Sequence, residues 1–233
     1  MENNSKQAVL SIVGIAVLVI AVVGVSFAFF TYSKTGTTNN VITTGSITFD
    51  FTAPENGLSL TNQFPQSDAE GKTNNQFAFS VTGTLPTSMA PINYSVYAIK
   101  GDVPTVEGKS YTETNRLKNS EINFYVTTTT GGTIEGGYGT ATDPDYGAVV
   151  TDAIDSGTAT AGTGLLIATG TIPANNSEVT HSYAITMWVN DTVTISDTDT
   201  TKKYCASASE CTGGRAIYSD LFYSFKIRVD AQG

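Results

Sequence analysis

Residues 222–230 read FYSFKIRVD, and this stretch decides the fold class. Apolar and polar residues alternate along it, with Tyr223, Phe225, Ile227 and Val229 set against Ser224, Lys226, Arg228 and Asp230. Successive side chains of a β-strand point to opposite faces, so a period of two residues predicts a strand that buries one face.

The same alternation recurs along the chain, in Ile47–Phe51, Phe77–Val81, Ile92–Val96, Ile122–Val126, Gly164–Ile172 and Val179–Val189. In the last segment Tyr183, Ile185, Met187 and Val189 share one face, and we expect Trp188, on the other face, to be half exposed. Roughly eight strands with long connections predict an all-β, antiparallel two-sheet sandwich. A jelly-roll-like sandwich is favoured over an immunoglobulin-like one, which would need an inter-sheet cysteine pair.

The segments between these strands are predicted to be loops. Leu58–Lys72 contains Pro65, Gly71 and many amide and acidic side chains, and Gly101–Ser120 mixes charges with Pro and Gly. Gly131–Gly147 is rich in glycine. Asp143-Pro144 is typical of a helix start, so a short helix is expected to continue to Ile154.

The composition limits the partners of the chain. Of its 233 residues 12 are Lys or Arg and 21 are Asp or Glu, which gives a net charge of −9 and a sequence pI near 4.4. An acidic chain repels polyanions, so nucleic acid is excluded as an expected partner. Thr, Ser, Asn and Gly must supply most of the polar surface, which favours strands over helices.

An uncharged apolar run occupies residues 8–30. As one N-terminal apolar helix it would be roughly 35 Å long, enough to cross a bilayer core of about 30 Å. The small residues Ser26 and Ala28 also resemble a signal-peptidase site, with cleavage before Phe29. Residues 1–28 are therefore interpreted as a signal peptide or a membrane anchor.

The remaining chain divides into residues 29–40, a polar tether or donor segment, and residues 41–233, a single β-sandwich domain. Thr31–Asn40 shows no hydrophobic periodicity and is interpreted as a linker. We expect the domain to lie outside the cell, at the surface or in the matrix. The alternative is a single-pass membrane protein, held by residues 8–30, with its domain outside.

The two cysteines, Cys205 and Cys211, enclose a short loop. In an oxidising compartment a disulfide can close such a loop. A zinc site needs more ligands than two cysteines and the chain's single histidine, so a disulfide is the favoured interpretation.

No catalytic or cofactor-binding motif is found. His181 lies between Thr180 and Ser182 and is expected to point to solvent; no Gly-x-Ser-x-Gly elbow accompanies it. The acidic residues that could bind calcium do not match an EF-hand and are interpreted as solvated turns: Asp143, Asp145, Asp191, Asp197 and Asp199. We therefore expect neither an enzyme nor a bound cofactor or metal.

Two segments carry a family resemblance: residues 24–33, GVSFAFFTYS, and residues 44–51, TGSITFDF. Together they resemble the TasA and camelysin group of Gram-positive surface proteins. The resemblance implies a jelly-roll protein that a dedicated signal peptidase exports. For TasA it also implies matrix fibres, in which the mature N-terminal segment completes the sheet of a neighbouring subunit. Here that donor segment would include Phe29, Phe30 and Tyr32. Camelysin-like proteins are described as metalloproteases, but this chain has no His-Glu-x-x-His.

The expected function is that of an exported structural protein that self-assembles, through its N-terminal segment, into fibres at the cell surface or in the matrix. Two alternatives stay open. The chain can be a membrane-anchored binding or display protein that keeps its apolar helix. It can also be a viral coat or spike component.

Overall fold

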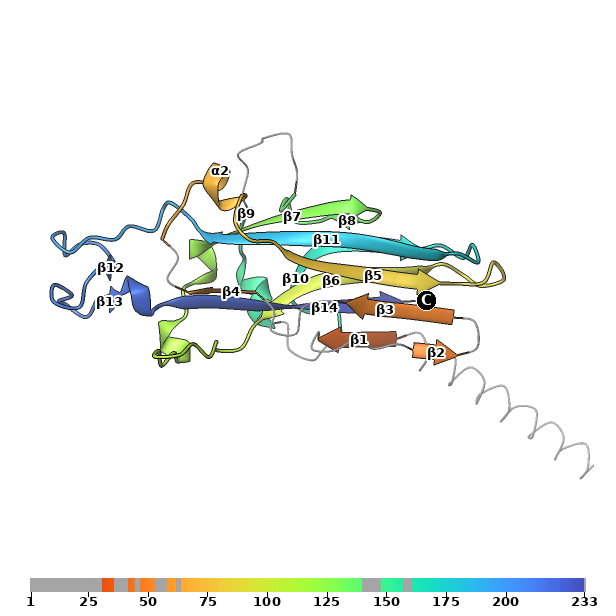
Figure 1. The fold of residues 1–233 in the computed structure, drawn as a ribbon, viewed down its shortest axis with the longest axis horizontal. Coiled ribbons are helices and arrows are strands. Elements are labelled where there is room, and N and C mark those ends of the chain that lie inside the picture. Colours follow the sequence, from red (N-terminus) through yellow and green to blue (C-terminus); the bar gives the residue numbers. More distant parts are fainter. Residues whose placement is uncertain are drawn as a thin grey trace, which may run out of the picture.

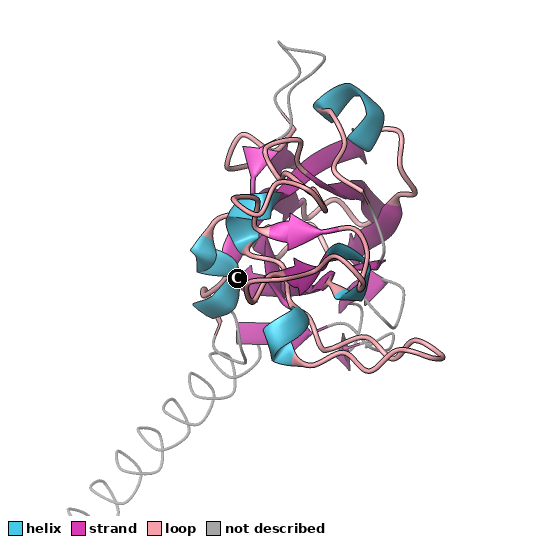
Figure 2. Cartoon of the chain, turned by 90° about the vertical axis from the view of Figure 1, so that its left-hand side faces the viewer, coloured by secondary structure: helices cyan, strands magenta, loops and turns pink. Residues whose placement is uncertain are grey.

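Two antiparallel sheets of six strands each form the framework of the chain that the structure describes. The structure is a computed structural model, and it describes residues 31–35, 42–44, 47–52, 58–61, 64–139, 148–156 and 161–232. The long strands of both sheets run along the long axis of the molecule (Figure 1). In the view turned by 90° the strands are seen nearly end-on (Figure 2).

The first sheet has the order β1-β14-β6-β10-β8, and β4 is an additional partner of β14. Its strands are β1 Thr31–Thr35, β4 Leu58–Thr61, β6 Ile92–Lys100, β8 Thr133–Ile134, β10 Leu165–Ile172 and β14 Phe222–Gln232. The second sheet has the order β2-β3-β5-β11-β7-β9. Its strands are β2 Ile42–Thr44, β3 Ile47–Thr52, β5 Phe77–Thr84, β7 Ile122–Thr130, β9 Ala148–Val149 and β11 Glu178–Val189.

The smaller elements lie in the connections. A parallel pair, β12 Tyr204–Cys205 and β13 Ala216–Ile217, forms an arm at one end of the molecule (Figure 1). The helical turns are α2 Asp68–Gly71, η1 Glu113–Asn115, η2 Asn119–Glu121, η3 Asp152–Ser156 and η4 Tyr218–Asp220. Each is too short to form a layer of its own, so the described fold is mainly β.

The predicted alternation appears in the burial of the strands. Along β5 every second residue is buried, starting with Phe77, and β6 follows the same rule over most of its length. Side chains from both sheets meet in one apolar core, whose most buried members include Val81, Val96, Phe124, Ile167, Ile185 and Phe225. The prediction of an antiparallel, mainly β fold is therefore confirmed, because period-two patterns bury one face of each sheet.

The first predicted strand is also present, as β3. Its register places Phe49 opposite Gly83 and Phe51 opposite Val81, and both partners belong to the buried face of β5. Directly opposed residues of antiparallel strands share a face, so the register agrees with the predicted phase of this strand.

The prediction of a loop over Leu58–Lys72 is wrong. Leu58–Thr61 forms β4, which pairs with Phe222–Phe225, and Asp68–Gly71 forms α2. Ser67 and Glu70 cap that helix reciprocally: the Ser67 side chain accepts from the Glu70 amide, and the Glu70 carboxylate accepts from the Ser67 amide. This Ser-x-x-Glu capping box was visible in the sequence.

The expectation that Trp188 is half exposed is also wrong. Its side chain is 0% exposed, although it lies on the face of β11 that points away from the core. Helix α2 covers it, and a Cβ placed on Gly71 would overlap the indole ring. Asn123 Nδ2 donates to Asp68 Oδ1 at 2.7 Å and so ties this helix to β7. A short helix thus replaces solvent on one patch of the second sheet.

Three further expectations change in the connections. Ala148–Val149 pairs with β7 as a strand, so the helix expected to continue to Ile154 is wrong there, and only Asp152–Ser156 forms a helical turn. The glycine-rich loop contains β8 within Gly131–Gly147. Gly101–Ser120 contains no named strand but is not simply exposed, since Leu117 is buried. Residues 140–147, which include Asp143 and Asp145, lie outside the described chain.

Within the described residues, no helix has the length and apolarity needed to cross a membrane. The apolar run 8–30 lies outside those residues.

Substitution of Gly71 tests the packing of α2 on Trp188. Gly71→Ala should lower the free energy of unfolding by about 1 to 3 kcal/mol, because the added methyl group has no space above the indole ring. Urea denaturation measures this. In a Trp188→Leu background the same substitution should cost much less, because the smaller side chain leaves room. An equal cost in both backgrounds would contradict the proposed packing.

Candidate functional site

Strand β14 is an inner strand of the first sheet, next to the outer strands β1 and β4, and its two edges are used differently. One edge pairs with β6 from Phe225 to Gln232. The other edge is shared: β4 pairs with Phe222–Phe225, and β1 pairs with Arg228–Gln232. The C-terminal half of β14 therefore receives its second partner from the N-terminal part of the chain.

Both faces of this half of β14 are buried. Val229 and Ala231 face the core. On the opposite face the Arg228 guanidinium and the Asp230 carboxylate form an ion pair at 3.1 Å, with side chains 1% and 5% exposed. Arg228 also lies over the ring of Tyr97, 5.0 Å from its centroid.

A loop closes over this ion pair. The Gly162 amide donates to Asp230 Oδ2 at 2.6 Å, and Arg228 Nη2 donates to the carbonyl of Thr163. A buried ion pair is expensive to desolvate and tolerable only when further hydrogen bonds satisfy it. The contacts with Gly162 and Thr163 provide such bonds to this ion pair.

Strand β1 forms the outer boundary of the sheet. Its register runs from Thr31 opposite Gln232 to Thr35 opposite Arg228, with Tyr32 opposite Ala231. Among the described strands, β14 is the partner with which β1 pairs. Residues 29–40 are interpreted from the sequence as a polar tether or donor segment. Thr31–Thr35 is a strand, although its sequence shows no alternation, and it pairs with the edge of β14 through its main chain.

The other sequence-predicted residues of this region, Ser26, Ala28, Phe29 and Phe30, lie outside the described residues. Cleavage before Phe29 and a donor role for Phe29 and Phe30 stay predictions. Tyr32 is the member of the predicted donor segment that lies in a described strand, and that strand pairs with β14 of its own chain.

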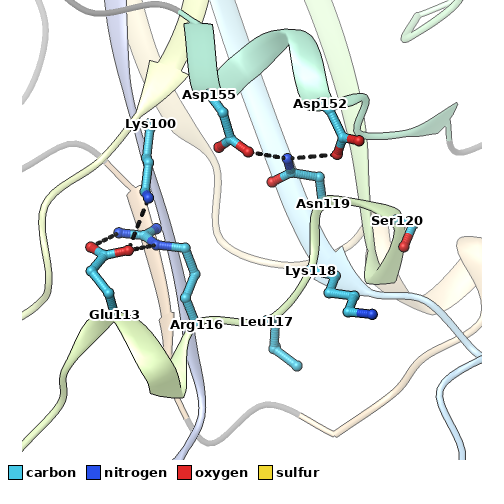
Figure 3. Close-up of a pocket in the computed structure, with 9 residues that line it drawn as sticks. All are labelled: Lys100, Glu113, Arg116, Leu117, Lys118, Asn119, Ser120, Asp152 and Asp155. Carbon is cyan, nitrogen blue, oxygen red and sulfur yellow. Dashed lines mark hydrogen bonds and ion pairs between the residues drawn. The ribbon is translucent and has the colours of Figure 1, made fainter.

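A polar cavity of about 360 Å³ lies beside the other half of β14 (Figure 3). On one side Lys100 and Arg116 contact Glu113 at 2.9 and 3.0 Å. The hydrogen bond from Arg116, reinforced by that from Lys100, lowers the pKa of Glu113 to about 2. This carboxylate therefore stays ionised and neutralises part of the positive charge of its neighbours.

On the other side of the cavity Asn119 holds two carboxylates. Its Nδ2 donates to Asp152 Oδ1 at 3.1 Å and to Asp155 Oδ2 at 3.0 Å, as Figure 3 shows. Its Oδ1 accepts from the hydroxyl of Tyr223 at 2.8 Å. Asn119 thus links η3 to β14.

Within the described residues, no group of three or more His, Cys, Asp or Glu side chains is placed to hold a metal ion. The carboxylates of Asp197 and Asp199 accept hydrogen bonds from main-chain amides instead. Asp197 Oδ1 accepts from the amides of Ala206 and Ser207, and Asp199 Oδ1 accepts from Thr201. Hydrogen bonds from Ser207 and Thr201 lower the pKa values of Asp197 and Asp199 respectively.

Cys205 and Cys211 are joined in the arm that contains β12 and β13. Their Cα atoms are 5.4 Å apart, a separation that suits a disulfide. Asp197 binds Ala206 and Ser207, the two residues after Cys205. The bond and the acidic turn together fix the tip of the arm.

Reduction tests the contribution of this bond. In the chain-entropy model, closing a loop with a sequence separation of 6 stabilises a fold by about 2 to 3 kcal/mol, so dithiothreitol should lower the free energy of unfolding by that amount. Urea denaturation with and without reductant measures the loss. A Cys205→Ser/Cys211→Ser variant should not respond to reductant. Two free thiols in the protein kept under non-reducing conditions would contradict the bond.

The expectation that His181 points to solvent is wrong. The side chain is 8% exposed, and its Nδ1 lies 2.5 Å from the hydroxyl of Tyr94. That hydroxyl also lies 2.6 Å from the hydroxyl of Tyr183. The sequence did contain the signal: His181 is in phase with Tyr183 and Ile185, which lie on the core face of β11, whereas its neighbours Thr180 and Ser182 are polar.

Burial lowers the pKa of His181 and raises that of Tyr183. Burial, together with the hydrogen bond between the hydroxyls of Tyr94 and Tyr183, also raises the pKa of Tyr94. The three side chains are therefore neutral together near pH 7. Within the described residues, no serine or cysteine side chain is hydrogen-bonded to the imidazole. The cluster therefore lacks the nucleophile–base pair of a Ser-His or Cys-His site.

The lowered pKa of His181 predicts a loss of stability in weak acid. The unfolded chain, with a histidine pKa near 6.5, binds a proton before the folded chain does, so the free energy of unfolding should fall as the pH drops below about 6.5. Urea denaturation between about pH 7.5 and pH 5 measures this, and His181→Gln should remove this component. An imidazole that titrates above 6.5 in NMR would refute the prediction.

Comparisons with protein-family models, with curated proteins and with solved structures found no match to this chain.

Proposed function

We propose that this chain is an exported structural protein of a Gram-positive cell surface or extracellular matrix, and that it assembles into fibres by exchanging β1 between subunits. The surface location and the fibre rest on the resemblance of residues 24–33 and 44–51 to the TasA and camelysin group. The exchange rests on the position of β1 at the edge of β14.

The strand order supports a jelly-roll fold for the domain. When β4, β5, β6, β7, β9, β10, β11 and β14 are numbered in chain order from one to eight, the two sheets run 1-8-3-6 and 2-7-4-5. Strands that alternate between two sheets in this way form the two Greek keys of a jelly roll. Strands β1, β2, β3 and β8 are additions at the margins of that pattern.

The observation that carries the proposal is the pairing of β1 with β14. An unpaired edge strand exposes amide and carbonyl groups that another chain can satisfy. Thr31–Thr35 satisfies them in its own chain. The same segment of a neighbouring subunit can make identical main-chain pairs, so exchange leaves the number of main-chain pairs unchanged. Association is then opposed mainly by the loss of translational and rotational freedom.

The connection between the sheets limits the geometry of exchange. Residues 36–41 join β1, in the first sheet, to β2, in the second. A connection of this length reaches at most roughly 25 Å. After exchange, β14 of one subunit must therefore lie within that distance of β2 of the next. A head-to-tail contact of this kind that does not close into a ring builds a fibre.

Cross-linking distinguishes exchange from pairing within one chain. Thr31 lies opposite Gln232, which is exposed, so Thr31→Cys/Gln232→Cys places two thiols side by side. After oxidation, fibres should yield a ladder of covalent multimers on a denaturing gel, and the monomer should yield an internal bond. Each single substitution serves as a control and should give no ladder. Fibres that contain only internal bonds, or a protein that never polymerises, would overturn the proposal.

A chain that begins at Thr37 gives a second test, because it lacks β1. It should not polymerise, and a synthetic peptide of residues 29–36 should bind it by pairing with β14. A peptide in which Tyr32 is replaced by Asp should bind at least tenfold more weakly, since position 32 pairs with Ala231 on the core face. Fibre formation by the shortened chain would rule out the role of β1.

The competing function, a membrane-anchored binding protein, keeps residues 8–30. The N-terminal sequence and intact mass of the protein recovered from cells separate the two. A chain that starts at Phe29 is expected for a released subunit. A chain that retains the apolar run would contradict release and favour the anchored alternative.

A further inference from the structure

One row of residues crosses the first sheet at the point where β1 binds. The register sets Tyr32 of β1 opposite Ala231 of β14. It sets Ala231 opposite Tyr94 of β6, and Tyr94 opposite Gly170 of β10. Directly opposed residues of antiparallel strands share a face. Ala231 and Tyr94 belong to the apolar core, so positions 32 and 170 lie on the core face of the sheet as well.

The core-face side chains of β14 become smaller toward this row. In chain order they are Tyr223, Phe225, Ile227, Val229 and Ala231. A well-packed core sets large residues against small ones at facing positions. The aromatic residue of β1, at position 32, is thus opposite the smallest core-face residue of β14.

The side chain of Tyr94 lies over Gly170, its neighbour on the side away from Ala231. A Cβ placed on Gly170 would overlap the Tyr94 hydroxyl and the ring carbon that bears it. The phenol therefore extends over β10 and not over β14. Any larger residue at position 170 would compete with the phenol for this space.

Two hydrogen bonds hold the phenol of Tyr94 in this place. Its oxygen lies 2.5 Å from His181 Nδ1 and 2.6 Å from the Tyr183 hydroxyl, and both partners belong to β11 of the second sheet. Both partners are buried, so water does not compete for these bonds. Tyr94 would lose both bonds if its ring moved across to Ala231.

We propose that the core face at Ala231 is an acceptor position for the aromatic side chain at position 32 of a second copy of the chain. Tyr94, held over Gly170, is the positioning residue that keeps this position clear. The inference rests on the proposed exchange of β1 and adds selection by a side chain to the main-chain pairing. In strand addition the main chain supplies affinity, and positions for alternate side chains supply specificity. The edge of β14 therefore selects strands with an aromatic residue opposite Ala231.

Disulfide trapping on the full chain tests this selection. The chain carries Gln232→Cys, and two synthetic peptides of residues 29–36 carry Thr31→Cys, the position opposite residue 232. One peptide keeps Tyr32 and the other carries Tyr32→Ala, and both are added at equal concentration in a mildly oxidising thiol buffer. Both compete with the chain's own β1, so the ratio of the two trapped products, measured by intact mass, reports the side chain at position 32. The Tyr32 peptide should be trapped at least tenfold more, because it buries an aromatic ring.

A peptide of scrambled sequence with the same cysteine separates the two ways in which this test can fail. If both peptides are trapped equally and well above the scrambled peptide, the exchange stands and the acceptor position is overturned. If neither peptide exceeds the scrambled one, the exchange itself is overturned, and the acceptor position with it.

Variants of the chain locate the selection within the row. Gly170→Ala should displace the phenol of Tyr94 toward Ala231 and lower the preference for the Tyr32 peptide at least fivefold. Ala231→Leu fills the acceptor position directly and should abolish the preference; it carries the test if the first variant fails to fold. Thr171→Val, on the outer face of β10, is the matched control and should keep the full preference. An unchanged preference in both Gly170→Ala and Ala231→Leu would overturn the assignment.

Discussion

The main-chain pairing of β14 is the constraint on which the rest of the structure depends. This strand is buried on both faces over its C-terminal half, by the core on one side and by the Arg228–Asp230 ion pair on the other. Its amide and carbonyl groups can reach partners only in the plane of the sheet. Pairing with β6 satisfies one edge, and the other edge needs two separate segments, β4 and β1. Residues 31–35 and 58–61 thus complete the sheet beside residues 222–232.

The sequence allowed the sheets to be predicted because their signal is local. Period-two alternation in 77–81, 92–96, 122–126 and 223–229 depends only on which residues face the core, and the structure places each of these segments in a long strand. The short strands β8, β9 and β12 carry no such signal. They are defined by a neighbouring strand that happens to pass close by, which is a property of the whole fold.

The errors at Trp188 and His181 have different physical causes. Trp188 lies on the solvent-side face of its strand, as its phase predicted, but a helix of four residues covers that face, and only the tertiary structure brings Gly71 there. For His181 the phase was informative and the polarity of Thr180 and Ser182 was misleading. Its partner Tyr94 is 87 residues away, so no local pattern could reveal that its polarity is satisfied inside the fold.

The composition of β1 explains why a strand without alternation can still form, and why the same strand is suited to exchange. Its sequence, TYSKT, contains one aromatic residue among polar ones, whereas β11 contributes Tyr183, Ile185, Met187 and Val189 to the buried core. A strand of the second kind is fixed by packing in its own subunit, since withdrawing it would leave large cavities. The main-chain pairs between β1 and β14 are the same whichever copy of the chain supplies β1. The segment that sequence patterning could least predict is thus one whose place is set by a strand edge formed elsewhere in the chain.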